Sequence, residues 1–438
     1  MKKREEPFCL PIRKIQIMVE KIKHIFRDPE LRGRILFVLG VLTVFRITAA
    51  IPIPGVNIAQ LRSFLDGNQL LGLLNIFSGG ALDNLSIAML GLGPYITGSI
   101  IMQLMTIVFP KLKEMYQEDG EAGRQKFNQY SRLLTVPLAF VQGYGLLTLL
   151  GRQGILADIT FLGTVTNVII ITGGALFLMW LGELISEYGI GNGVSLMIFA
   201  GIVAGVPTSL QQTFFVFDRS QIPIFIIFII LALAVIAAIV FITEGERPIP
   251  VSYAKRVRGM KMYGGFSTYL PLRVNQAGVI PIIFALSIIL FPQMFAGFLT
   301  VSSNTVLQSI GNFFLNFSNN LLAFGSFYFI LVFFFTYFYT AVTFDPDNIA
   351  ENLQKSGGFV PGIRPGRPTA DYLSHIINRI TLAGALFLGV IAVLPFVVQA
   401  ATGIVTLTLG GTALLIVVSV VLEFIKQIEG KLVMREYE

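Results

Sequence analysis

The chain has 438 residues, of which 54% are hydrophobic and only 13% are charged, and its formal net charge is +7. Soluble globular proteins carry about twice that charged fraction. The composition therefore excludes an ordinary soluble enzyme and indicates an integral membrane protein.

The chain begins with a basic segment at 1–33. Residues 13–26 place apolar side chains at helical spacing opposite lysines. This pattern predicts an amphipathic helix on the membrane surface, with a solvated basic tail as the alternative. The segment lacks the apolar core and cleavage site of a signal peptide. The single cysteine, Cys9, cannot form an internal disulfide.

Long apolar runs then recur along the chain and predict about ten transmembrane helices. They fall near 34–51, 86–109, 133–150, 165–186, 195–216, 222–243, 276–292, 321–344, 380–399 and 405–425. The isoleucine-rich run at 226–230 does not indicate strands, because a continuous apolar segment in lipid satisfies its backbone as a helix. The predicted fold class is an all-α integral membrane protein.

Positive charge alternates along the chain and orients the predicted helices. Of the 32 Lys and Arg residues, 28 lie in residues 1–34, in the connections at 110–132, 244–273 and 345–379, or after residue 425. Cytoplasmic loops carry the Lys and Arg excess. Both termini, including the tail at 426–438, are therefore predicted to be cytoplasmic.

The predicted helices divide into two halves of five, at 34–216 and 222–425, which would have inverted topology. The second span of each half contains a Gly/Pro cluster, at 91–94 and 278–281. Paired interruptions at equivalent places indicate a functional centre between two pseudo-symmetric halves. The alternative is that Gly and Pro are simply frequent in membrane helices.

Ionisable side chains are missing from the middle of the predicted spans, where ion-coupled transporters and pumps need them. Arg46 lies near the outer end of the first span, and Glu183 and Glu187 lie near the inner end of the fourth, where long side chains can reach water. The sequence has no phosphate-binding loop, zinc-protease motif or nucleophile with an apparent base. The chain is therefore predicted not to be an enzyme and to need no cofactor or metal. Two classes of membrane protein then remain: a channel and, as the alternative, a secondary transporter of a small solute.

Two cytoplasmic connections, 244–274 and 345–379, are much longer than ordinary helix connections. Both mix basic residues with Pro, Gly and aromatic residues. This predicts a docking surface for a large partner, such as an acidic protein face, ribosomal RNA or anionic lipid head groups.

Several segments resemble the SecY/Sec61-alpha family of protein-conducting channels, over nearly the whole chain after residue 30. They are FRITAAIPIPGV (45–56), NIFSGGALDNLSI (75–87), GPYITGSIIMQL (93–104), MWLGELISEYGIGNGVSLMIFAGIVAG (179–205), YLPLRVNQAGVIPIIFA (269–285) and KSGGFVPGIRPGRPT (355–369). The resemblance implies a pore-forming subunit of a protein translocase in a bacterial cytoplasmic (inner) membrane. Such a subunit conducts unfolded secretory polypeptides and releases transmembrane segments sideways into lipid. The implied partners are SecE and SecG, the SecA motor ATPase, the ribosome, signal peptides, unfolded preproteins and membrane lipids.

The resemblance also implies a closed hourglass pore. Its apolar ring would consist of Leu92, Ile96, Val194, Ile198, Ile283 and Ile416. An outer plug would span 71–82, around Asn75, Ile76, Phe77, Ser78, Gly79 and Gly80. The sequence agrees in part, because Leu92/Ile96 and Val194/Ile198 are i,i+4 pairs that share one helix face. A narrow apolar constriction resists wetting and blocks ions.

The remaining implied sites are a lateral gate and a docking tip. The gate, between the second and seventh spans, would carry the neutral polar residues Thr97, Gln142 and Asn275. The motor or the ribosome would dock at Arg364 and at the tip of the 244–274 loop, with Arg256, Arg258 and Lys261. Met260 stands in this tip where the family often has a basic residue.

Overall fold

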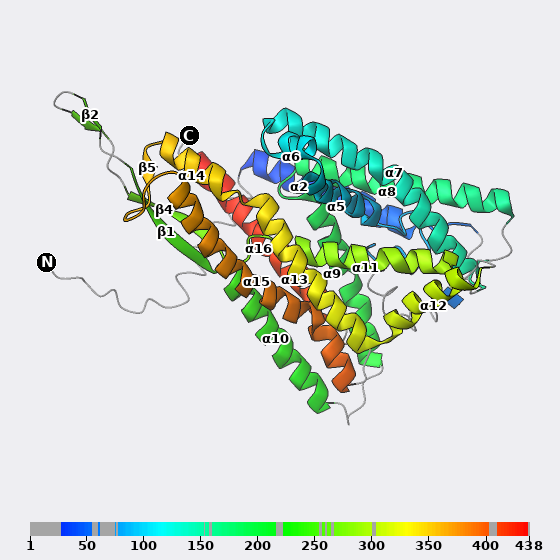
Figure 1. The fold of residues 1–438 in the computed structure, drawn as a ribbon. Coiled ribbons are helices and arrows are strands. Elements are labelled where there is room, and N and C mark those ends of the chain that lie inside the picture. Colours follow the sequence, from blue (N-terminus) through cyan, green and yellow to red (C-terminus); the bar gives the residue numbers. More distant parts are fainter. Residues whose placement is uncertain are drawn as a thin grey trace.

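The computed structural model of the chain describes residues 28–54, 60–61, 75, 78–152, 154–156, 160–215, 222–253, 256–258, 261–263, 267–299, 304–402 and 410–436. The interfacial helix predicted at 13–26 and Cys9 lie outside these residues. The described chain is mostly helical, with a small β-structure at one end (Figure 1).

A helix covers all or most of each predicted span in the described residues. In the first half these helices are α2 (Pro29–Ala50), α5 (Gly93–Val108), α7 (Gly120–Arg152), α8 (Phe161–Tyr188) and α9 (Gly193–Phe215). In the second half they are α10 (Ile222–Glu244), α11 (Ile280–Leu299), α13 (Leu321–Thr343), α15 (Arg367–Thr402) and α16 (Gly410–Glu436). The isoleucine-rich run at 226–230 lies in α10, so its prediction as helix rather than strand is confirmed.

Five helical segments among the described residues are long and apolar enough to cross a membrane. A sixth is added if α5 and the following α6 (Pro110–Gln117), whose axes differ by 113°, form one span. Shorter apolar stretches lie within α9, α10 and α11. The total of ten spans stays a prediction.

Three shorter helices were not predicted. They are α6, α12 (Thr305–Asn319) and α14 (Pro346–Lys355). Proline occupies the first turn of α6 and of α14, where its missing N–H costs nothing and its fixed φ suits a helix start. Asp345 caps α14 by accepting hydrogen bonds from the backbone N–H groups of Asp347 and Asn348.

The two long connections, 244–274 and 345–379, are joined by a β-sheet that the sequence did not predict. Strand β1 (Glu246–Tyr253) pairs antiparallel with β4 (Ser267–Arg273) and, on its other edge, with β5 (Gly358–Phe359). A separate hairpin of β2 (Arg256–Arg258) and β3 (Lys261–Tyr263) projects away from the helices (Figure 1). Buried residues of the sheet, of the turn that follows β5 and of α15 form one cluster: Ile249, Leu272, Val360, Leu373, Ile376 and Ile377.

Among the described residues, the helices of the two halves pack on each other chiefly at two interfaces. On one side α11 of the second half packs against α5 and α7 of the first, and on the other side α16 packs against α9. We call the first interface the seam. The largest buried hydrophobic cluster lies between these helices and draws residues from both halves.

The two Gly/Pro clusters lie at equivalent places, but they start helices instead of interrupting them. Helix α5 begins at Gly93, with Pro94 in its first turn, and α11 begins at Ile280, directly before Pro281. Gly91 and Gly278 precede the two helices with φ of 55° and 61°, a backbone region that favours glycine. The expectation of mid-helix breaks is therefore corrected, because proline is accommodated most easily in a first turn.

Candidate pore constriction and lateral seam

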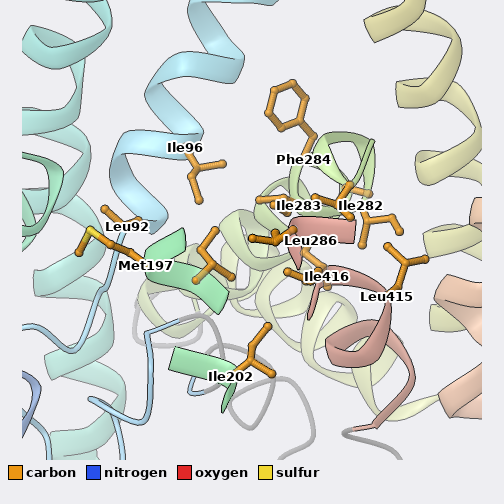
Figure 2. Close-up of a cluster of buried hydrophobic side chains, with 14 of the residues drawn as sticks. Leu92, Ile96, Met197, Ile202, Ile282, Ile283, Phe284, Leu286, Leu415 and Ile416 are labelled. Carbon is orange, nitrogen blue, oxygen red and sulfur yellow. The ribbon is translucent and has the colours of Figure 1, made fainter. Parts of the chain in front are cut away.

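The predicted ring residues come together in the structure. Leu92, Ile96, Ile198, Ile283 and Ile416 are all buried members of the large cluster between the halves, and Val194 packs against it. They lie on α5 and its N-cap, on α9, on α11 and on α16. These are four of the helices that form the two interfaces between the halves. Figure 2 shows four of these side chains, Leu92, Ile96, Ile283 and Ile416, in one apolar region.

The same cluster contains further side chains that sequence reasoning missed. Figure 2 labels Met197, Ile202, Ile282, Phe284, Leu286 and Leu415 among them. Met197 and Ile202 are on α9 beside Ile198, and the other four are neighbours of Ile283 or Ile416 along the chain. A sequence signal existed, since all six are apolar residues in the same helices. The assignment of six particular residues to a sealing ring stays a prediction.

The described part of the predicted plug is held against α2. Ser78 is buried, and its hydroxyl donates to the backbone carbonyl of Asn75, 3.0 Å away. Gly79 has a φ of 74°, and a Cβ there would clash with the ring of Phe45. The Arg46 guanidinium donates a hydrogen bond to the carbonyl of Gly79. Ile76 and Phe77 lie outside the described residues.

The three predicted gate residues are buried, at 6% exposure each. Thr97 donates to the Gly93 carbonyl of its own helix at 2.9 Å, and the Asn275 amide donates to the Gly278 carbonyl at 3.2 Å. The Asn275 Oδ1 atom is buried without a hydrogen-bond partner. At the seam α11 packs against α5 and α7, and the assignment of these three residues to a lateral gate stays a prediction.

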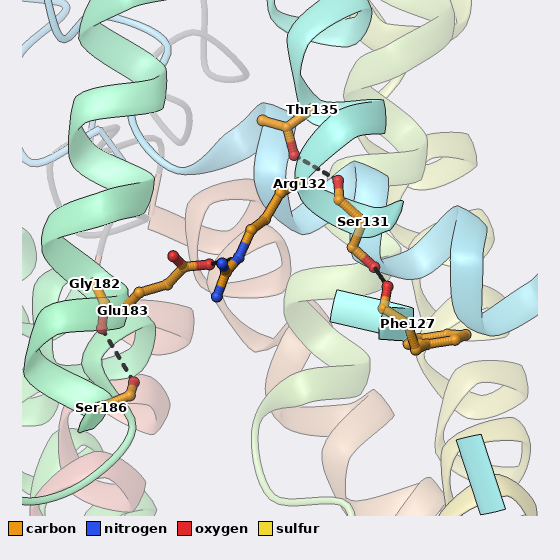
Figure 3. A network of polar contacts seen from close by, with 7 residues as sticks. All are labelled: Phe127, Ser131, Arg132, Thr135, Gly182, Glu183 and Ser186. Atoms are coloured by element: carbon orange, nitrogen blue, oxygen red, sulfur yellow. Dashed lines mark hydrogen bonds and ion pairs between the residues drawn. The ribbon is translucent and has the colours of Figure 1, made fainter. Parts of the chain in front are cut away.

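An ion pair beside the seam was also missed. Arg132 on α7 pairs with Glu183 on α8, with 45% and 21% of the two side chains exposed. Figure 3 shows this pair next to hydrogen bonds that stay within the helices, from Thr135 to the Ser131 carbonyl and from Ser186 to the Gly182 carbonyl. Glu183 thus reaches a cation of the neighbouring helix, whereas the sequence suggested only access to water.

The Gly-Ile-Gly-Asn-Gly motif at 189–193 forms the turn between α8 and α9. The Asn192 side chain accepts from the backbone N–H groups of Val194 and Ser195, at 3.1 and 3.3 Å. The Ser186 hydroxyl accepts from the N–H of Gly193 at 2.9 Å. The motif therefore fixes the start of α9, the helix that carries two of the predicted ring residues.

The predicted docking residues lie at the end of the second half that carries the β-strands (Figure 1). Arg364 is exposed in the turn between β5 and α15, and its carbonyl accepts a hydrogen bond of 2.8 Å from the Thr369 hydroxyl. Gly362 and Gly366 flank it with φ of 87° and 91°. Arg256, Arg258 and Lys261 lie on the β2–β3 hairpin, and their side chains lie outside the described part of the chain.

The comparison with known families decides which family this chain belongs to. The SecY family model matches residues 86–425. The protein translocase subunit SecY of Mycobacterium tuberculosis (strain ATCC 25618 / H37Rv) is 45% identical over 434 residues, which cover 94% of this chain and 97% of that protein. This chain belongs to the SecY family.

Solved structures agree with this assignment at the level of the fold. One described as "The structure of a protein conducting channel" has a TM-score of 0.62, with 19% identity and 90% of each chain covered. A second, of Sec61 in the canine ribosome-channel complex from the endoplasmic reticulum, has a TM-score of 0.58, again with 19% identity and 90% of each chain covered. The all-α membrane fold is confirmed, and as a SecY-family chain this protein is the pore-forming subunit of a protein translocase.

Proposed function

We propose that this SecY-family chain seals its resting channel with the six-residue ring and the plug, and admits signal sequences to lipid through the seam. The observation that carries the proposal is the single apolar cluster built from both halves, which contains five ring residues and contacts the sixth. Bulky apolar walls resist wetting, and they make no strong bond with a passing polypeptide. An unfolded chain of any sequence can therefore slide through once the ring widens.

The proposed gate lies at the seam, because α11 packs there against α5 and α7 of the other half. Loss of packing between helices costs little when lipid can replace it. The orphaned Oδ1 atom of Asn275 lowers the stability of the closed seam further, since a buried acceptor without a partner costs about 1 to 3 kcal/mol. A seam of this kind opens when an apolar signal helix supplies equivalent packing.

The proposed partners follow from the family. SecE and SecG are the expected small membrane subunits, and SecA or the ribosome would dock at Arg364 and the β2–β3 hairpin. The chain itself performs no catalytic step in this proposal, so the energy for transport comes from the motor or from synthesis. The proposed location is a bacterial cytoplasmic membrane with both termini cytoplasmic.

Crosslinking of a stalled precursor tests the proposed path. In a Cys9→Ser background, Thr97→Cys places a thiol on the buried side of α5 and Ile169→Cys places one on the exposed face of α8, where 59% of Ile169 is accessible. We expect the apolar core of the signal sequence to crosslink at position 97 and not at 169. Crosslinks that never form at 97, or that form equally at both positions, would place the path elsewhere.

A further inference from the structure

A polar cleft lies at the boundary between the two halves, near the C-terminal ends of α5 and α13. It has a volume of about 440 Å³, which is in the range of small-molecule sites. Its walls come from α6 and α7 of the first half and from the α13–α14 junction of the second. The lining residues are Tyr116, Gln117, Arg124, Asn128, Val342, Thr343, Asp345 and Asn348. Gln117 donates to the Val342 carbonyl across this boundary, at 3.3 Å.

The cleft holds one cation and one anion, and each comes from a different half. Arg124 is positioned by its Nε atom, which donates to the Tyr116 carbonyl at 3.4 Å. The Asp345 carboxylate is fixed by the backbone N–H of Asp347 and by both nitrogens of Asn348, at 2.8 to 3.2 Å. None of the ion pairs between described residues joins Arg124 to Asp345, and both side chains line the cleft. Both charges therefore face the cleft without neutralising one another.

We propose that this cleft binds the head group of an aminophospholipid, with the phosphate at Arg124 and the primary ammonium at Asp345. A ligand with only negative charge would be repelled by Asp345, and one with only positive charge by Arg124. A zwitterion satisfies both, and the Asn128 amide, which also lines the cleft, offers a hydrogen-bond donor to the phosphate oxygens.

The chemistry of the cleft selects a primary ammonium over a choline group. An ammonium donates three hydrogen bonds, and the Asp345 side of the cleft offers the carboxylate, the Thr343 hydroxyl and the Val342 carbonyl as acceptors. A choline group has no N–H, and aromatic cages are its usual sites. The only aromatic residue among those that line this cleft is Tyr116, whose ring packs on Phe127.

The position of the cleft favours a membrane lipid as the source of this head group. Helix α5 ends in exposed apolar residues, with Ile107 and Val108 each 66% accessible and Phe109 50%. The next helix, α6, has the sequence PKLKEMYQ and no buried residue. This change from apolar to charged surface marks the level of the head groups. The exposed end of α5 provides a surface for acyl chains next to the helix that lines the cleft.

Native mass spectrometry of the purified, delipidated full chain tests the proposal. Phosphatidylethanolamine, phosphatidylcholine and phosphatidylglycerol with identical acyl chains are added in parallel. We expect phosphatidylethanolamine to be retained about tenfold better than the other two. Arg124→Gln and Asp345→Asn should each reduce that retention several-fold, and Asn at 345 can still cap α14. The matched control is Lys126→Gln, which removes a charge from the same helix outside the cleft.

Each contrary outcome overturns a defined part of the proposal. Equal retention of phosphatidylcholine would remove the ammonium site, and stronger retention of phosphatidylglycerol would make the cleft a simple anion site. Competition by free phosphoethanolamine as strong as that by the lipid would identify a soluble ligand instead. Unchanged retention in both variants would place the lipid elsewhere. None of these measurements depends on transport, so they fail or succeed independently of the channel function.

Discussion

Arg46 illustrates how one side chain can connect two parts of the candidate channel. The sequence suggested only a charge near the outer end of the first span, but the structure directs its guanidinium to the carbonyl of Gly79 in the predicted plug. Hydrogen bonds that involve a charged group are worth roughly 1.5 to 3 kcal/mol, and solvent screening lowers that value for Arg46, which is an exposed residue. Arg46 is therefore a candidate for holding the plug in its resting position.

Arg46→Gln should weaken this hold and let ions leak through the resting channel, because the amide cannot reproduce the charged donor. Ion conductance of the channel reconstituted in lipid measures the effect. Arg46→Lys, which keeps the charge, should leak less than Arg46→Gln. A resting conductance that is the same in all three proteins would show that Arg46 does not retain the plug.

The ring residues give a second prediction at this scale. Ile96→Ser, Ile198→Ser and Ile283→Ser should each raise resting conductance, since a hydroxyl-lined constriction wets more easily than an apolar one. The control is Ile229→Ser on α10, a position 58% exposed on the outer face of that helix. If none of the three ring variants conducts more than the control, the seal lies at other members of the cluster.

At the scale of elements, the seam depends on how α11 meets α5 and α7. Asn275→Leu and Gln142→Leu replace buried polar groups, and Asn275→Leu also removes the orphaned Oδ1 atom. Leucine packs equally well against protein and lipid, so the balance between closed and open seam should shift. We expect precursors with weak or defective signal sequences to be exported at a changed rate.

A precursor with a strong signal sequence is the internal control for this experiment, and its export should change little. The export rates of weak and strong precursors are compared in the same cells. Unchanged export of weak precursors in both leucine variants would separate these residues from the gate.

The tip that carries Arg364 is a second element with a testable role. Its backbone is restrained by the Thr369 hydroxyl, and the arginine side chain is exposed. Arg364→Glu should abolish motor-driven translocation and leave insertion and assembly intact, because it inverts a presented charge outside every span. Lys355→Glu makes the same charge change in the same loop, away from the tip. Equal translocation by the two variants would show that Arg364 contributes only to the Lys and Arg excess that orients the spans.

Sequence reasoning found the elements that depend on their own residues and missed those that depend on distant parts of the chain. The long apolar runs predicted their helices well, because a continuous run of that kind satisfies its own backbone. Strand β1 was missed because its sequence, ERPIPVSY, contains two prolines, and one of its partners, β5, lies about a hundred residues further on. The contact from Arg46 to Gly79 and the pair of Arg132 with Glu183 also require the folded arrangement of helices.

For the whole molecule, the predicted topology is the property that most needs a direct measurement. The only cysteine in the sequence is Cys9, so Cys9→Ser gives a background without thiols. We expect Thr160→Cys and Ser309→Cys to react with a membrane-impermeant thiol reagent added outside, and Lys126→Cys and Glu351→Cys to react only after the membrane is permeabilised. All four positions are exposed. Reaction of a residue from the wrong side would change the number or the direction of the spans.

The β-sheet that joins the two long connections has a mechanical consequence. Strand β1 fastens both long connections together, and the sheet packs on α15 through Leu373, Ile376 and Ile377. In the part of the chain that the structure describes, the hairpin and the Arg364 turn are thus both connected to a sheet that packs on the second half (Figure 1). A partner that pushes on the β2–β3 hairpin or on the Arg364 turn would apply force to α15 and to α13, which packs beside α15. A push at this surface would therefore load the second half first, and the first half would feel it through the packing of α11 on α5 and α7 and of α16 on α9.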